Sequence, residues 1–81
     1  MNFPTEREVQ EIKSRYPKGT RVRVSFLNDP YNTKVVPGSE GTVRLVDDIA
    51  TIHVDWDCGS RLGLIVDEDI FTVLETGGVK E

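Results

Sequence analysis

Short runs in which apolar and polar residues alternate begin at Thr20 and recur to Leu74, and this period of two constrains the fold more than any other feature. Successive side chains of a β-strand point to opposite faces, so the alternation predicts strands with one buried face. The runs are 20–27, 42–45, 50–56 and 62–66, followed by an apolar run at 71–74. The residues predicted to face the core are Val22, Val24, Phe26, Val43, Leu45, Ile52, Val54, Trp56, Leu62 and Leu64.

The connections between these five runs indicate how the strands are arranged. A long connection, 28–40, separates the first two strands, and a two-residue turn at Asp47-Asp48 separates the second and third. A four-residue turn, 57–60, follows, in which Gly59 can take a positive φ, and the acidic stretch 67–69 predicts one 3₁₀ turn before the last strand. This order is typical of a mainly β fold, an SH3-like five-stranded antiparallel small barrel whose partial closure protects its edges.

A change of period marks a helix before the strands, at about residues 5–15. Thr5 and Glu8 have the spacing of a capping box, and Pro17 ends the helix. Its narrow apolar stripe of Val9, Ile12 and Tyr16 has to pack on something larger, because so short a helix is marginal alone. We therefore predict one amino-terminal α-helix packed on the barrel.

Length, charge and cysteine content limit the class of protein. With 81 residues the chain builds one core, so we predict a single domain, 1–81, with the barrel at about 19–75 and a loose tail at 76–81. The net charge is −4, with +2 on residues 1–40 and −6 on 41–81. One cysteine, no signal-like start and no apolar stretch of membrane-spanning length lead us to expect a cytoplasmic protein without a membrane partner.

Several ordered motifs resemble one known family. They are Tyr16-Pro17-Lys18-Gly19-Thr20-Arg21-Val22, Asn28-Asp29-Pro30-Tyr31, 36–43, Asp47-Asp48-Ile49, 52–60 and 62–65. Over residues 16–74 the chain resembles the domain of unknown function 4314 family, small proteins of Gram-positive bacteria, their phages and mobile elements. Ala50-Thr51 stands where that family usually has a glycine and a polar residue. The resemblance implies the fold and the biological setting, and it implies no catalytic residue.

The residues that carry chemistry form no convergent set, so we expect no enzymatic activity, no catalytic residue, no metal and no cofactor. His53 is predicted on the outer face of a strand, and Cys58 in a hairpin turn is predicted to be an accessible thiol. One histidine and one cysteine are too few for a usual zinc site, and no oxyanion-hole motif accompanies them. The acidic residues of 47–48, 55–57 and 67–69 fit solvated turns, where aspartate is common.

Aromatic residues are the first candidates for partner contacts. Tyr31 follows Pro30 in the long connection, where it either anchors the loop on the barrel or presents itself to a partner. Trp56 shares the parity of the core residues, but its place at a strand end can leave an edge for a ligand. We therefore predict an interaction module that binds a protein or peptide through Pro30, Tyr31 and Trp56, in a groove between the long loop and the 57–60 turn.

A basic run supports an alternative function. From Lys13 to Arg23 there are five basic residues and no acidic one. These residues either pair with the acidic second half or form a surface for an anion or nucleic acid, as in KOW-like accessory nucleic-acid-binding proteins. The residues of that alternative surface are Lys18, Arg21, Arg23 and Arg44.

Overall fold

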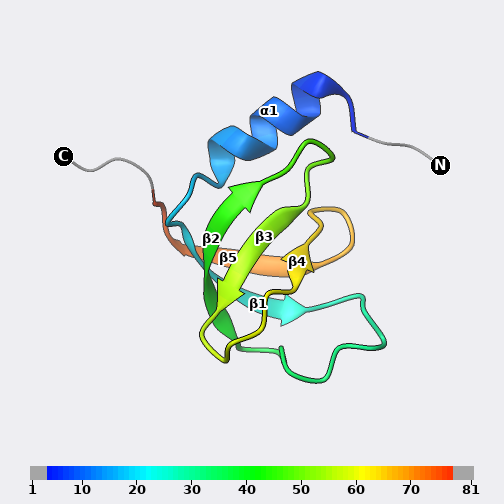
Figure 1. The fold of residues 1–81 in the computed structure, drawn as a ribbon, viewed down its shortest axis with the longest axis vertical. Helices are drawn as coiled ribbons and strands as arrows, with labels where there is room; N and C mark the ends of the chain where they lie inside the picture. The colour runs from blue at the N-terminus through cyan, green and yellow to red at the C-terminus, as the bar shows by residue number, and fades with distance from the viewer. Residues whose placement is uncertain (1–3, 78–81) are drawn as a thin grey trace.

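The computed structural model describes residues 4–77, which form one helix and five strands (Figure 1). The elements are α1 (Glu6–Arg15), β1 (Arg21–Phe26), β2 (Glu40–Val46), β3 (Ile52–Trp56), β4 (Gly63–Leu64) and β5 (Ile70–Glu75). The strands form one antiparallel sheet in the order β4-β3-β2-β1-β5. The predicted fold class is confirmed: the protein is mainly β, with five antiparallel strands and an amino-terminal helix. The sheet is not closed, so β4 and β5 are its two edges.

Local chemistry fixes α1 as the sequence predicts. Thr5 Oγ1 accepts the Glu8 amide at 3.1 Å, and Glu8 Oε1 accepts the Thr5 amide at 2.9 Å, which completes the capping box. Val9 is buried, and Tyr16 lies 5.4 Å from the Phe71 ring of β5, measured between ring centroids. The helix lies across one end of the curved sheet (Figure 1), where its apolar stripe meets the core.

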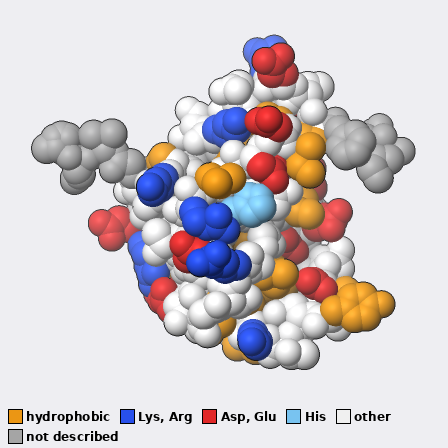
Figure 2. Space-filling view, in the orientation of Figure 1, with side chains coloured by type: hydrophobic (Ala, Val, Ile, Leu, Met, Phe, Trp, Pro, Cys, Tyr) orange, Lys and Arg blue, Asp and Glu red, His pale blue; other side chains and the backbone are white. Residues whose placement is uncertain are grey.

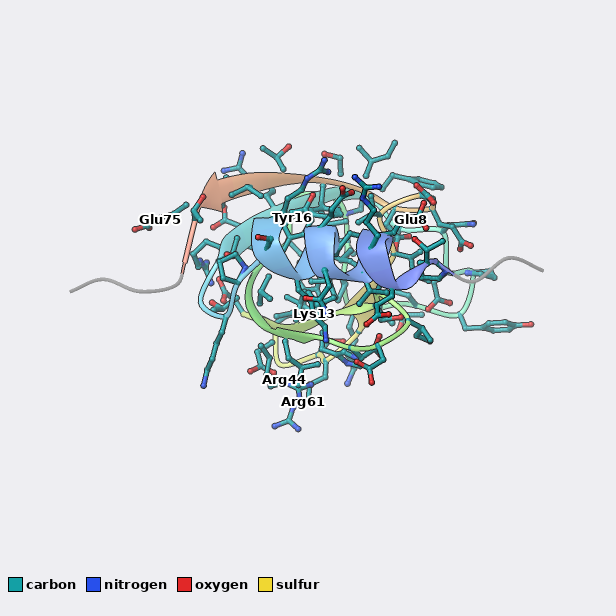
Figure 3. All side chains as sticks on the ribbon, turned by 90° about the horizontal axis from the view of Figure 1, so that it is seen from above. Glu8, Lys13, Tyr16, Arg44, Arg61 and Glu75 are labelled. Atoms are coloured by element: carbon teal, nitrogen blue, oxygen red, sulfur yellow. The ribbon has the colours of Figure 1, made fainter. Side chains whose placement is uncertain are left out.

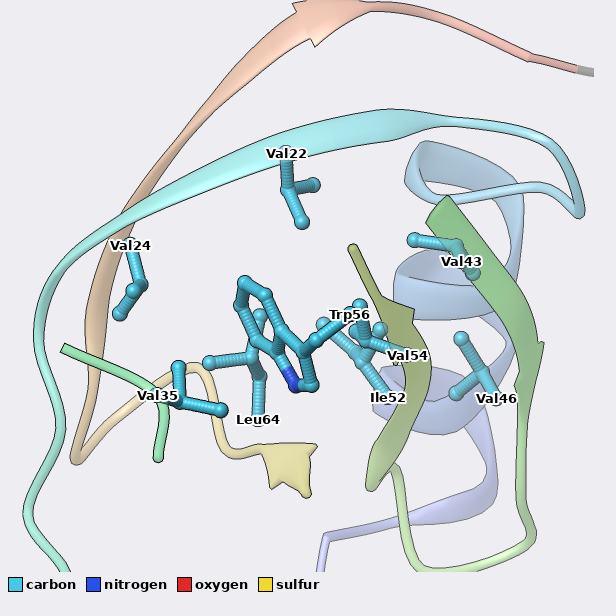
Figure 4. Packing of buried hydrophobic residues seen from close by; sticks show 9 residues of the cluster. All are labelled: Val22, Val24, Val35, Val43, Val46, Ile52, Val54, Trp56 and Leu64. Carbon is cyan, nitrogen blue, oxygen red and sulfur yellow. The ribbon is translucent and has the colours of Figure 1, made fainter. Parts of the chain in front are cut away.

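The core lies inside the curve of the sheet and is built mainly from aliphatic residues around one tryptophan. Figure 4 shows the Trp56 ring between β1, which contributes Val22 and Val24, and the Val35 and Leu64 side chains. All four aliphatic residues are almost completely buried. Seven of the predicted core residues are confirmed as buried, namely Val22, Val24, Val43, Ile52, Val54, Trp56 and Leu64, while Leu62 is partly buried against the cluster.

Two predicted core residues, Leu45 and Phe26, are exposed, so those predictions are wrong. Val43 pairs with Val54 and Leu45 with His53, which leaves Arg44 as an extra residue in β2. This β-bulge inverts the parity that follows, so Leu45 shares the outer face with His53 and Val46 turns inward. A similar register shift between Val24 and Phe26 places Phe26 opposite exposed Ile70.

The β2–β3 connection and the strand β4 differ in length from the predictions, whereas the 57–60 turn has the predicted glycine conformation. The β2–β3 connection covers 47–51 rather than two residues, and Ala50 within it has a φ of 66°. The 57–60 turn has Gly59 at a φ of 99°, as predicted. β4 covers only two residues, and the acidic stretch forms a turn in which the Glu68 and Asp69 amides donate to the Ile65 carbonyl.

The carboxyl-terminal end of the described chain is held near the start of β1. The Gly77 amide donates to Thr20 Oγ1 at 3.0 Å, and Thr20 is buried. Residues 78–81 of the predicted loose tail lie outside the described residues. Within 4–77, α1 is too short and too polar to cross a membrane.

Candidate functional site

The long β1–β2 loop, residues 27–39, is fixed by its own side chains. Asp29 Oδ1 accepts the Tyr31 amide at 2.9 Å, and Asn32 Oδ1 accepts the Val35 amide at 2.9 Å. Val35 is buried in the core and anchors the middle of the loop. The Gly38 amide donates to the Val24 carbonyl at 2.7 Å, which ties the far end of the loop to β1. The loop therefore has a defined conformation, although it contains no strand.

The loop presents Tyr31 to solvent. Its side chain is 90% exposed, and Pro30 beside it is exposed as well. Phe26, the last residue before the loop, pairs with Ile70 on β5, and both of these are exposed apolar residues. Val35, and not Tyr31, anchors the loop on the core. The exposed position of Tyr31 therefore fits the second alternative, presentation to a partner.

Trp56 occupies a different environment from Tyr31. It is 3% exposed, and its Nε1 donates to the Leu62 carbonyl at 2.7 Å. The fold therefore brings Pro30 and Tyr31 to the surface and places Trp56 in the core beneath. We predicted a groove between the long loop and the 57–60 turn. In the structure Cys58 of the turn is exposed, and its Sγ lies 3.7 Å from the carbonyl oxygen of Lys34 in the loop.

Arg21 lies on the outer face of β1 in a bidentate ion pair. Its guanidinium donates to both carboxylate oxygens of Asp57, at 2.9 and 2.7 Å, and also reaches Thr42 Oγ1 and Glu40. The hydrogen bond from Arg21 holds the pKa of Asp57 below its ordinary value, and the hydrogen bond to Asp57 raises the pKa of Arg21. The Arg21 guanidinium is therefore already hydrogen-bonded to neighbouring side chains, and a ligand would have to displace them.

The other basic candidates differ in how they are paired. Arg23 contacts Glu40 at 3.2 Å, and Arg44 contacts Asp55 at 3.3 Å. Arg61 approaches the same Asp55 oxygen at 3.7 Å, and Figure 3 shows Arg44 and Arg61 projecting side by side. Lys18 is exposed and forms no ion pair within residues 4–77.

His53 interacts with a carboxylate next to these basic residues. Its Nε2 lies 2.9 Å from Asp47 Oδ2, and Figure 2 shows Lys or Arg side chains beside the histidine on one side. Burial raises the pKa of Asp47, but hydrogen bonds from His53 and from the Thr51 and Ile49 amides outweigh it, so the pKa is below its ordinary value. Since His53 engages Asp47 and Cys58 contacts a backbone carbonyl, the two residues form no nucleophile pair in the described part of the chain.

Sequence reasoning missed a groove of about 440 Å³ beside the helix. One wall is α1, and the opposite wall is the β4–β5 connection from Ile65 to Glu68. Ile49 and Ala50 of the β2–β3 connection also line it. Ile49 and Ile65 could have indicated the groove in the sequence, because both are apolar residues outside the alternating core pattern.

Sequence reasoning also missed the role of Asp69, which it assigned to a solvated turn. Its side chain is buried, with Oδ1 accepting the Asn28 amide and Oδ2 accepting the Ile65 amide, both at 2.8 Å. One carboxylate thus joins the start of the Tyr31 loop to the wall of the groove.

Comparison with known proteins agrees with the resemblance and extends it. The family described as a domain of unknown function (DUF4314) matches residues 5–74, a span that includes α1 as well as the sheet. No curated protein and no solved structure matches the chain significantly. Because the match covers the described fold from the helix cap to the last strand, the chain belongs to the DUF4314 family.

Proposed function

We propose that this protein is a non-enzymatic SH3-like interaction module that binds a protein or peptide partner through the loop carrying Pro30 and Tyr31. The observation that carries the proposal is the 90% exposure of Tyr31 on a loop whose backbone is held by Asp29 and Asn32. The family resemblance supports a bacterial, phage or mobile-element setting. The lone cysteine supports action in the reducing cytoplasm.

The preorganised loop favours binding through Tyr31. Tyrosine is among the residues that dominate binding energy at protein interfaces, because its ring buries a large area with few torsions to restrict. A loop already fixed before binding avoids the entropy cost of ordering its residues when the partner binds. The exposed Phe26 and Ile70 at the foot of the loop extend the apolar area available to a partner. In this proposal Trp56 supports the site from the core and does not contact the partner.

The alternative, a nucleic-acid surface formed by Lys18, Arg21, Arg23 and Arg44, is less well supported. Three of the four residues already have carboxylate partners, which a phosphate would have to displace. Displacement from the bidentate Arg21–Asp57 pair would leave Asp57 facing the incoming anion. No specific observation favours this alternative over the loop surface.

Site-specific photocrosslinking tests the proposal. Tyr31 is replaced by benzoylphenylalanine in the full chain, and a matched variant carries the same group at Gln10, which is exposed on α1. We expect irradiation to join a discrete protein to position 31 and not to position 10. The captured partner is then titrated against Tyr31→Ala, Tyr31→Phe and the double variant Arg21→Ala with Arg23→Ala.

The expected ranking separates the two functions. Tyr31→Ala should weaken binding by more than about tenfold, whereas Tyr31→Phe and the double arginine variant should stay close to wild type. If the arginine variant loses binding and Tyr31→Ala keeps it, the basic surface is the site and our proposal is wrong. A single-stranded oligonucleotide titrated in parallel would then bind with steep salt dependence.

A further inference from the structure

The groove beside α1 has a helical wall with one consistent face. Glu8, Glu11, Ile12 and Arg15 line it, and because Glu11 and Ile12 each lie three or four residues from both Glu8 and Arg15, all four fall on one side of the helix. Ile65 to Glu68 form the opposite wall. The groove thus runs between two segments that are far apart in sequence.

The groove combines exposed apolar side chains with an acidic rim. Ile49 is 55% exposed and Ile65 is 42% exposed, and the partly buried Ile12 and Val66 also line the groove. The rim carries four carboxylates and one guanidinium, those of Glu8, Glu11, Asp67, Glu68 and Arg15. None of the four acidic residues forms an ion pair within residues 4–77.

We propose that this groove binds a peptide segment of a partner protein in which a pair of apolar side chains is flanked by lysine or arginine. The apolar side chains cover Ile49 and Ile65, and the flanking cations meet the carboxylates of the rim, which form no ion pair within residues 4–77. The excess of negative charge opposes an anionic occupant such as nucleic acid or an acidic lipid surface. This site lies apart from the Tyr31 loop and adds a second binding face to the proposed module.

The apolar centre of the groove favours apolar side chains, and its acidic rim favours cations, so we choose a segment that has both. Isolated exposed isoleucines are common on protein surfaces, but two that line one recess offer a contiguous apolar contact. Charged rims contribute little to affinity by themselves, yet they select partners by sign and accelerate association. An apolar centre with basic flanks satisfies both halves without burying an unpaired charge.

Synthetic peptides test the proposal with the full-length protein. The probe is a fluorescein-labelled peptide with two leucines at its centre and two lysines on each side, followed by anisotropy and by ¹⁵N chemical-shift mapping. Matched peptides replace the lysines by glutamate or the leucines by serine. We expect binding of the Lys/Leu peptide alone, with shifts centred on the amides of Ile49, Ile65 and Asp67.

Two charge-matched triple variants localise the contact. The groove variant is Glu11→Gln, Asp67→Asn and Glu68→Gln, and the control variant is Glu6→Gln, Asp48→Asn and Glu75→Gln, whose residues lie outside the groove lining. We expect the groove variant to weaken binding by roughly 3- to 30-fold and the control by less than about twofold, because each exposed charge pair contributes only modestly. Ile49→Asn should weaken binding without changing the fold, which circular dichroism checks.

Each result has a definite consequence. Equal binding of the lysine and glutamate peptides, or equal loss from both triple variants, would overturn the proposal. Concentration-dependent self-association that only the groove variant abolishes, without peptide binding, would assign the groove to a second copy of the chain and also overturn it. Tyr31→Ala should leave peptide binding unchanged, so failure of the groove site and failure of the Tyr31 site are distinguishable.

Discussion

Asp69 is the polar residue on which the arrangement of the two candidate surfaces most depends, and Asp69→Asn tests this. The side chain is 9% exposed, and its two oxygens each accept one backbone amide at 2.8 Å, from Asn28 and from Ile65. Asparagine has nearly the same shape but offers one oxygen and one NH₂ group. In the variant, one of the two amides therefore faces a donor instead of an acceptor.

The two hydrogen bonds to Asp69 set the expected change in the free energy of unfolding. Leaving a buried amide without an acceptor costs about 1–3 kcal/mol, so Asp69→Asn should lower the free energy of unfolding by about 2 kcal/mol. Asp69→Ala removes both acceptors and should cost about 3–4 kcal/mol on the same basis. A domain of this size has a total of roughly 4–12 kcal/mol, so the alanine variant should lose at least about a quarter of its stability. The asparagine variant should lower Tm by about 10 °C.

Urea unfolding followed by tryptophan fluorescence measures these values directly. Trp56 is the only tryptophan and is 3% exposed, so its emission reports loss of the core. The matched control is Asp67→Asn, an exposed residue of the same turn, which should change stability by less than about 0.5 kcal/mol. If Asp69→Asn is as well tolerated as Asp67→Asn, the carboxylate does not join the two segments and the reasoning fails.

Three other predictions concern the β2–β3 connection and the thiol. Ala50→Gly should change the free energy of unfolding by less than about 1 kcal/mol, because relief of the 66° φ offsets the loss of a buried methyl group. Ala50→Val should lower the free energy of unfolding by about 2 kcal/mol, and urea titration compares the two variants. Because the pKa of Asp47 is lower in the folded state than the ordinary 3.8, this carboxylate stabilises the fold above that value, and the contribution disappears as pH falls through the folded pKa. In Asp47→Asn the free energy of unfolding should therefore fall less steeply with pH below about pH 5 than in the wild type. The same slope in both proteins would contradict this prediction. Cys58 should react with iodoacetamide at about the rate of an unstructured peptide thiol, since its contact is a neutral carbonyl; a much faster reaction would restore the nucleophile hypothesis.

The parts of the fold that sequence predicts well are those fixed by neighbouring residues. The Thr5–Glu8 capping box and the positive φ of Gly59 depend only on residues within one turn, and both are observed. The inward positions of Val22 and Val24 follow from simple alternation. In each case the local pattern and the tertiary structure agree, as expected for a chain that folds without strong conflicts.

Prediction fails where a partner strand or a distant loop decides the outcome. The bulge at Arg44 is set by pairing with β3, and nothing in 40–46 alone shows that Leu45 turns outward. Val35 lies in a stretch without periodicity and reaches the core only because the loop folds back on β1. The groove beside α1 escaped prediction for the same reason, since its walls are separated by about fifty residues of sequence.

The charge distribution shows how the fold changes the meaning of a sequence pattern. In sequence the run from Lys13 to Arg23 is the strongest basic feature, but Lys13 pairs with Asp48, and Arg21 with Asp57. These pairs join the basic first half of the chain to the acidic second half and neutralise much of the basic run. The acidic residues that keep no ionic partner within 4–77 include the four of the groove rim. Of the two interpretations of the basic run, these ion pairs support pairing with the acidic second half, and the groove that we propose for a cationic segment lies where the carboxylates keep no such partner within 4–77.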